Sequence, residues 1–590
     1  MSILFSLKNS ICYQNSMLRI FHRKHLLLNL NKNLTTQLSQ QPLAENQKVV
    51  SFDDNVKQRR DEANRSILVQ VQSAHSFHEL QSYCSSVGTV KKMMHYSTGV
   101  EPMHFIIVEF AKASDLQNIY TMSSYIEDTQ VVPVQSSYLW FRAATKKLSK
   151  NKNKSIHKLN VENGNHILRD NELLQVLNSC ADVNEQMVNL HNSTRLNEVG
   201  TRLRFLVAKQ IEMAISGMFP NSAALPFGSS VNGFGKMGCD LDLVLRLNDE
   251  SKVITDETRL VYHCKALSGS ERSISQRHME VIGDILQLFL PGCSQVRKIL
   301  QARVPIIKYY QQLTDVECDL SMSNTSGYHM SDFLYIMGAM DHRVRPLIFT
   351  IRRWAATVGL TNSSPGRWIT NFSLTLLVIG FLQNLPKPVL PSLNALVKLA
   401  GKNDKYITDD GINCTFLRDI NVYLATNPIE NTDSLKILLL QFFVYYSQFD
   451  FSSKAICLNE SMAIAKPEHS ALYIVNPLER GLNVSKNVSP EELEKFRLEV
   501  RNAAWLLESD ETKDSNWGII PLLTAKRILS MNNGNLPRTK LLEVSKLFED
   551  DKDGPVYKNN DVKKQVQNIR KDTKKQLENT LNVNQQKSGR

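Results

Sequence analysis

Two aspartates separated by one leucine form the pattern in this chain that is best suited to chemistry. Asp240 and Asp242 lie in a run, Cys239–Leu247, that alternates like a β-strand. Their side chains are therefore expected on the same side of the strand, about 7 Å apart. Two carboxylates on one rigid face favour hard cations such as Mg²⁺. Asp319, in a second short strand-like run, offers a third carboxylate, so the sequence predicts a two-metal site.

A glycine-rich turn precedes the paired acids. It begins at Gly228 and Ser229 and continues through glycines at positions 233, 235 and 238. Backbone N–H groups in such a turn, together with the Ser229 hydroxyl, can hold phosphates. The turn is not a P-loop, because Phe234 stands where that motif requires a lysine. A surface strand with two solvated acids is the alternative, but it explains neither the glycines nor Asp319.

These motifs resemble those of the DNA-polymerase-β-like nucleotidyltransferases, and among them the noncanonical poly(A) and terminal uridylyl polymerases. That family's signature is a Gly-Ser turn, two acids separated by one apolar residue, and a third acid. Two later segments, 369–383 and 438–451, are similar to its central helix and its poly(A)-polymerase-associated segment. Segment 476–489 is similar to its nucleotide-recognition loop. The resemblance covers about residues 200–490.

The resemblance implies roles for individual residues. Asp240 and Asp242 match the metal-binding acids, and Asp319 matches the third metal-site acid, which activates an RNA 3′ hydroxyl. The other matched positions imply nucleotide contacts: Gly228, Ser229 and Arg352 to the triphosphate, Asn324 to the ribose, Phe372 beneath the base with Asn371 as its polar neighbour, and Asn483 in the recognition loop.

Three positions distinguish this chain within the family pattern. Ala356 replaces a second basic residue after Trp354-Ala355, and Asn476 replaces the usual acid before Pro477. Relatives that prefer UTP carry a histidine before the loop asparagine, but here that position is Leu482. A leucine cannot hydrogen-bond to uracil and leaves room for a purine, which favours ATP.

The resemblance therefore implies a template-independent transferase that adds adenylates from ATP to RNA 3′ ends, with Mg²⁺ or Mn²⁺ as cofactor. A terminal uridylyltransferase on the same scaffold stays open as an alternative, as does a catalytically weak RNA-binding scaffold. A transferase that acts on tRNA ends or small molecules is a third. The expected partners are RNA 3′ ends, a second copy of the chain in a homodimer, and accessory RNA-binding proteins.

The length of 590 residues predicts several domains, and the resemblance implies an α+β fold. Residues 65–140 follow a β-α-β-β-α order that indicates a small RRM-like domain. Its strands offer few stacking aromatics beyond Phe105, which favours dimerisation over RNA binding. The expected layout continues with a basic linker over 141–164 and a nucleotidyltransferase palm, with leading helices and a mixed sheet, over 165–335. It ends with a helical nucleotide-recognition domain over 336–530 and a disordered charged tail over 531–590.

Composition adds the compartment and the class of partner. A net charge of +12 favours a polyanionic partner, such as nucleic acid, although an anionic membrane surface would also be attracted. Residues 1–44 contain no Asp or Glu and several basic residues at helix-like spacing, which predicts a mitochondrial transit peptide and a matrix location. No apolar run approaches the ~20 residues of a membrane span. The nine cysteines form no CxxC pair, which indicates reduced thiols.

Overall fold

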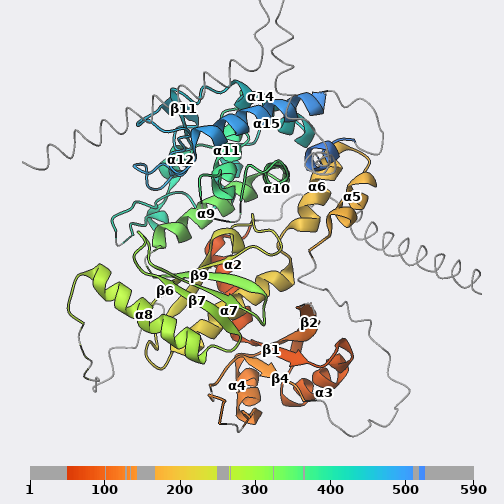
Figure 1. Ribbon diagram of the computed structural model, residues 1–590, viewed down its shortest axis with the longest axis vertical. Helices are drawn as coiled ribbons and strands as arrows, with labels where there is room; N and C mark the ends of the chain where they lie inside the picture. The colour runs from red at the N-terminus through yellow and green to blue at the C-terminus, as the bar shows by residue number, and fades with distance from the viewer. Residues whose placement is uncertain are drawn as a thin grey trace, which may run out of the picture. The chain divides into compact units, whose positions relative to one another are not determined.

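The computed structural model describes residues 49–524, with gaps at 100, 127–128, 133, 143–166, 249–262, 264, 266, 323, 363, 365, 409 and 509–516. The chain divides into two units, 1–526 and 527–590, and every described residue belongs to the first. The predicted transit peptide, most of the predicted linker and the predicted charged tail lie outside the described residues. Figure 1 labels the elements.

An N-terminal domain follows one leading helix, α2 (Phe52–Asn64). Its elements are β1 (Ser66–Val71), α3 (Phe77–Val87), β2 (Val90–Thr98), β3 (Met103–Phe110), α4 (Ala113–Met122) and β4 (Tyr138–Trp140). The strands form one sheet in the order β2-β3-β1-β4. The order of helices and strands is the expected one, but β4 runs parallel to β1. Strand β3 is antiparallel to β1. A helical crossover normally joins parallel strands, so it would make β4 parallel to β3 and therefore antiparallel to β1.

Both faces of this N-terminal sheet are covered. One set of alternate side chains, which includes Ile67 and Ile106, packs against α3 and α4. The opposite set, which includes Tyr96 and Phe105, packs against α2 and against the helix α7 (Glu198–Ile215) that follows later in the chain. The Tyr96 hydroxyl also donates to the carbonyl of Leu313, 2.7 Å away. The N-terminal sheet is therefore joined to the following domain through a continuous apolar core.

The following domain, the palm, is built on a five-stranded mixed sheet. Its strands are β5 (Ala223–Phe227), β6 (Leu241–Arg246), β7 (Cys293–Ile299), β8 (Ile306–Gln311) and β9 (Val316–Ser321). The order is β5-β6-β9-β8-β7, and β6 is parallel to β9 while the other neighbours are antiparallel. Leucines and other apolar residues at alternate positions pack on α7 and on α8 (Glu271–Phe289). The side chains between them face the other way, away from these two helices.

The rest of the described chain is mostly helical. Its helices are α9 (Thr325–Met340), α10 (Val344–Thr357), α11 (Asn371–Gln383), α12 (Leu393–Leu399), α13 (Ile420–Thr426), α14 (Leu435–Gln448) and α15 (Pro490–Glu508). A two-stranded sheet, β10 (Lys454–Cys457) with β11 (Met462–Ala465), joins them. Helices α5 (Asp170–Asn178) and α6 (Val183–Thr194) pack in the same core. Helices α5 and α6, which the predicted palm includes as leading helices, thus pack in the helical core, and the predicted boundary at 335 falls inside α9.

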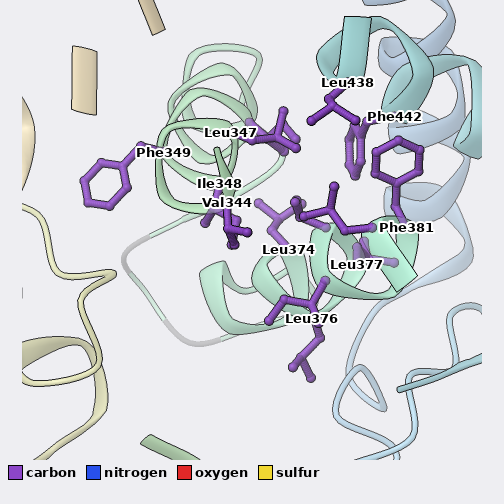
Figure 2. Close-up of a cluster of buried hydrophobic side chains, with 14 of the residues drawn as sticks. Val344, Leu347, Ile348, Phe349, Leu374, Leu376, Leu377, Phe381, Leu438 and Phe442 are labelled. Atoms are coloured by element: carbon purple, nitrogen blue, oxygen red, sulfur yellow. The ribbon is translucent and has the colours of Figure 1, made fainter. Parts of the chain in front are cut away.

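Helix α11 is apolar on all sides because other elements surround it. Thr370 caps its N-terminus by accepting from the N–H of Ser373. Figure 2 shows α10, α11 and α14 meeting through their aliphatic and aromatic side chains, with the rings of Phe381 and Phe442 close together. These two rings make an edge contact at 5.7 Å between centroids. Phe349 points away from this group and meets His191 of α6.

None of the described helices combines the length and apolarity needed to cross a membrane. The described cysteines are free thiols, as their scattered spacing predicts. The α+β fold class with a mixed palm sheet is confirmed. The RRM-like class of the N-terminal domain stays a prediction.

Candidate active site

Two of the three predicted acids lie side by side on the palm sheet. Parallel pairing of β6 with β9 places Asp242 opposite Asp319. Leu241 and Leu243 are buried on the side of α7 and α8, so the Asp242 side chain faces the other way. Strand β6 begins at Leu241, and Asp240 therefore lies in the turn just before it rather than inside the predicted strand. Asp240 is exposed, directly before the first residue of β6.

Mutual repulsion among the acids shows that their charges share a small region. Burial, followed by the charges of Asp319 and Asp240, raises the pKa of Asp242 to about 7. Partial loss of solvent, followed by the charges of Glu317 and Asp319, raises the pKa of Asp240. Negative charge at this end of the sheet is therefore poorly compensated by the protein itself, which is the electrostatic condition for binding a cation.

One basic residue partly offsets this charge, and the sequence analysis missed it. Lys308 of β8 stands opposite Asp319 of β9, and its Nζ lies 2.5 Å from Asp319 Oδ2. Its charge also acts against the raised pKa of both Asp240 and Asp242. A signal was available, because Lys308 is the single charged residue in the strand Ile306–Gln311. Its significance depends on the pairing of β8 with β9, which no local pattern reveals.

The glycine-rich turn is shaped around the same carboxylates. Gly228 has φ of +67°, and a Cβ there would collide with Oδ2 of Asp242. Its N–H donates to Oγ of Ser331, 2.7 Å away, which ties the turn to α9. The Ser230 hydroxyl donates to the backbone carbonyl of Asp240 at 3.0 Å. A Cβ at Gly235 would collide with the carbonyl of Ser229. The conformation of the turn therefore depends on its contacts with Asp240 and Asp242.

Arg352 of α10 lies behind this turn. Its Nη1 donates to the carbonyl of Phe234 at 2.7 Å, and burial of the guanidinium lowers its pKa to about 10. In this arrangement Arg352 supports the backbone of the turn. The resemblance implies instead a contact with the triphosphate, and that role stays a prediction. Ala356, the departure from the family's basic pattern, is exposed on the same helix.

The residues of the helical half that are predicted to contact the nucleotide differ in exposure and in hydrogen bonding. Asn324 caps α9, and its Oδ1 accepts from the N–H of Gly327 at 3.2 Å. Asn371 is exposed at the start of α11, and Phe372 beside it is half-buried against the helical core. Asn483 has partners in the loop and in the segment just before it, because Oδ1 accepts from the N–H groups of Ile474 and Ser485 and Nδ2 donates to the carbonyl of Leu472. Asn483 therefore shapes the loop.

The predicted recognition loop is fastened to the palm side through Glu479. Its carboxylate accepts from the Ser326 hydroxyl at 3.0 Å and pairs with Arg303 at 3.1 Å. Asn476, the other departure from the family pattern, accepts with its Oδ1 from the N–H groups of Leu478 and Glu479. A carboxylate could accept the same two bonds, so the asparagine preserves the local turn. The loop thus lies near the start of α9 and near Asn324.

The acids fit a magnesium site by their chemistry. Among the described residues, no group of three or more His, Cys, Asp and Glu side chains is arranged to hold a metal ion. Asp319 gives one oxygen to Lys308. The donor set is all carboxylate oxygen on neighbouring strands, which is what Mg²⁺ prefers, and the raised pKa of Asp242 marks charge that a cation would neutralise.

A mixed palm sheet with a Gly-Ser turn folded over paired acids, next to a helical domain, defines a nucleotidyltransferase of the template-independent RNA polymerase class. Residues 183–339 match the family described as "Poly(A) RNA polymerase, mitochondrial-like, central palm domain". The mitochondrial poly(A) RNA polymerase of Drosophila melanogaster is 47% identical over 560 residues, which span 89% of this chain and 90% of the relative. The human enzyme is 36% identical over 80% of this chain and 81% of its own length.

Solved structures agree with these relatives. A crystal structure of mtPAP in complex with UTP has a TM-score of 0.73 and 36% identity, and it covers 80% of this chain and 99% of that one. The complex of mtPAP with ATPγS has a TM-score of 0.72 and the same coverage. The chain belongs to the mitochondrial poly(A) RNA polymerase family. The mitochondrial location expected from the acid-free leader is thereby confirmed, while the leader itself lies outside the described residues.

Proposed function

We propose that this chain adds adenylates from ATP to the 3′ ends of mitochondrial RNAs, without a template. One observation carries the proposal: Asp242 stands opposite Asp319 on neighbouring strands, with the Gly228-Ser229 turn folded against the Asp242 carboxylate. This arrangement puts a phosphate-holding turn beside acids with uncompensated charge. Family membership supports the same activity, since the named relatives are poly(A) RNA polymerases.

The reaction is an in-line displacement. The 3′ oxygen of the RNA forms a bond to the α-phosphorus of ATP, the bond from that phosphorus to the bridging oxygen breaks, and pyrophosphate leaves. In this proposal Asp319 takes the proton of the attacking hydroxyl, the role that the resemblance implies for it. Asp240, Asp242 and Asp319 would hold Mg²⁺, or Mn²⁺, which when bound supplies charge neutralisation for the phosphates. The Gly228-Ser229 turn holds the triphosphate through its N–H groups and hydroxyl.

Asp242→Asn tests this assignment. Loss of a shared metal ligand is expected to lower the rate of RNA primer extension about a thousandfold, which corresponds to several kcal/mol of transition-state stabilisation. The measurement uses the purified full chain, a short RNA, Mg²⁺ and ATP. Asp284→Asn on α8 is the matched control, because Asp284 is an exposed acid that pairs with Lys298, on a helix that covers the face of the sheet opposite Asp242. The extension rate of this variant should be unchanged. Near wild-type extension by Asp242→Asn would refute the site.

Leu482 in the recognition loop is the basis for proposing ATP over UTP. Its backbone is held in the loop, because its N–H donates to Glu479 and its carbonyl accepts from Asn476. Leu482→His restores a side chain able to hydrogen-bond to uracil, so the ratio of UTP to ATP incorporation is expected to rise about tenfold. Primer extension with each nucleotide separately measures this ratio. An unchanged ratio would show that the loop does not choose the base.

A homodimer formed through the N-terminal domain completes the proposal. This domain exposes large apolar side chains, among them Met122, Tyr125 and Trp140, each more than half exposed. Apolar surface of this kind is typical of a protein contact. Light scattering of the full chain is expected to give a dimer mass, and the Tyr125→Ser, Trp140→Ser double variant a monomer. A monomeric wild-type chain would remove the dimer from the proposal.

A further inference from the structure

A cleft of about 360 Å³ adjoins the glycine turn, and none of the three acids lines it. Its walls come from α2, α9, the ends of α6 and α10, the N-terminal half of α7 and the turn itself. Ser229, Gly233 and Gly235 contribute the turn side. The polar groups opposite them include His191, Arg195 and Arg345. The residues lining this cleft include no aspartate or glutamate.

Two arginines of the cleft lack a carboxylate partner among the described residues. The buried Nε of Arg345 has no hydrogen-bond partner there, and its guanidinium lies over the ring of Tyr335 at 5.7 Å. Arg195 is exposed and lines the cleft, and burial, with a smaller contribution from the charge of Arg195, lowers the pKa of Arg345. Arg59, the third arginine, differs because it pairs with Glu62 and Glu198. The cleft therefore carries positive charge that described acids do not offset.

His191, which also lines the cleft, is affected by the positive charges of the same two arginines. Burial, followed by the positive charges of Arg195 and Arg345, lowers the pKa of His191 to about 4. His191 is therefore neutral near pH 7 and available for hydrogen bonding. His191, Arg195 and Arg345 all line the cleft, so the three side chains face a common space.

The turn is built to bring its backbone close to Arg345. Gly233 has φ of +82°, and a Cβ there would lie 2.9 Å from both Nε and Nη2 of Arg345. A side chain at this position would therefore force the turn or the guanidinium to shift. Partly buried, unpaired guanidinium groups are costly unless an anion offsets them, and their planar forks match the oxygens of phosphate. The volume suffices for a small phosphate compound.

We infer that this cleft is a second phosphate-binding site, separate from the three acids, and that it takes a phosphate or pyrophosphate group through Arg195 and Arg345. The phosphate comes either from a free anion or from the backbone of RNA. Both sources share the chemistry that the two guanidinium forks recognise. The inference does not depend on the proposed polymerase activity, because it concerns binding alone.

Calorimetry with the full chain in EDTA tests this site. Pyrophosphate is the first probe and a short RNA without a 5′ phosphate is the second. Without metal, the three carboxylates repel an anion from the acid site, so binding reports on the cleft. Arg195→Gln is expected to weaken binding of at least one probe about tenfold, through loss of a charge-assisted contact. Thermal unfolding verifies that the exposed substitution leaves the fold intact.

Lys236→Gln is the matched control. Lys236 is an exposed residue whose backbone bridges to that of Arg195, yet it does not line the cleft. The control should bind both probes like the wild type. Weakening of pyrophosphate alone identifies a free anion as the ligand, and weakening of RNA alone identifies its backbone. Equal effects of the two substitutions, or binding of neither probe by the wild type, would overturn the inference.

Discussion

Gly228 combines a positive φ with a close approach to the Asp242 carboxylate. Its positive φ and the closeness of Asp242 Oδ2 exclude a side chain. Gly228→Ala is therefore expected to destabilise the fold by about 1–3 kcal/mol and to reduce primer extension by far more than the loss of folded protein explains, because Asp242 must move. Urea unfolding and primer extension measure the two effects.

Gly217→Ala provides the matched control at the same scale. Nothing lies within 4 Å of a Cβ at Gly217, so this substitution should change stability by less than about 0.5 kcal/mol and leave extension unchanged. Equal behaviour of the two alanine variants would mean that the turn can relax without disturbing Asp242.

At the scale of elements, an ion-pair network fastens α2, α7 and β3 together. Arg202 of α7 pairs with Glu109 of β3 at 2.7 Å, with Glu62 of α2 at 3.2 Å and with Glu198 at 2.7 Å. Arg202 and Glu109 are both buried. Removing one member of a buried network leaves the others uncompensated, so Arg202→Ala is expected to cost about 3–5 kcal/mol of unfolding free energy. Arg497→Ala, in an exposed pair on α15, should cost less than about 1 kcal/mol.

The same network predicts a loss of stability in acid. Burial acts to raise the pKa of Glu198, but hydrogen bonds from Arg59 and Arg202 outweigh it and lower the pKa to about 2, below the ordinary 4.5. A depressed pKa contributes stability above the unfolded value of about 4.5, and this contribution is lost as the pH falls toward 2. The urea midpoint should therefore fall between pH 5 and pH 3, and fall less in Arg202→Ala. Parallel pH profiles for both proteins would contradict this account.

At the scale of the whole molecule, the N-terminal sheet serves as an internal contact surface. Phe105 stacks on Tyr96 at 5.3 Å, and both are buried against α2 and α7. Phe105→Ala should therefore cost about 3–5 kcal/mol of stability while RNA affinity of the folded chain stays the same. Filter binding under stabilising conditions and urea unfolding separate the two effects. Weaker RNA binding at unchanged stability would instead make this sheet a base-stacking platform.

The sequence by itself determined the class of chemistry. The residue types and spacing of Gly228-Ser229 and Asp240-Leu-Asp242, with Asp319 downstream, were sufficient because each motif is local and each residue type has a narrow chemical use. Local periodicity indicated the strand-like and helix-like segments, and the family resemblance implied the α+β class with a mixed sheet. Ends of elements were less certain, as the start of β6 after Asp240 shows.

Tertiary structure alone decided what depends on contacts between distant segments. Pairing of β8 with β9 brings Lys308 to Asp319. Packing of α10 against the glycine turn brings Arg352 and Arg345 close to the backbone of that turn. Burial of Phe105 against α7 likewise needs the two domains in contact. The physical reason is that charge, burial and partner are properties of a neighbourhood, and neighbours far apart in the chain leave no local pattern by which to find them.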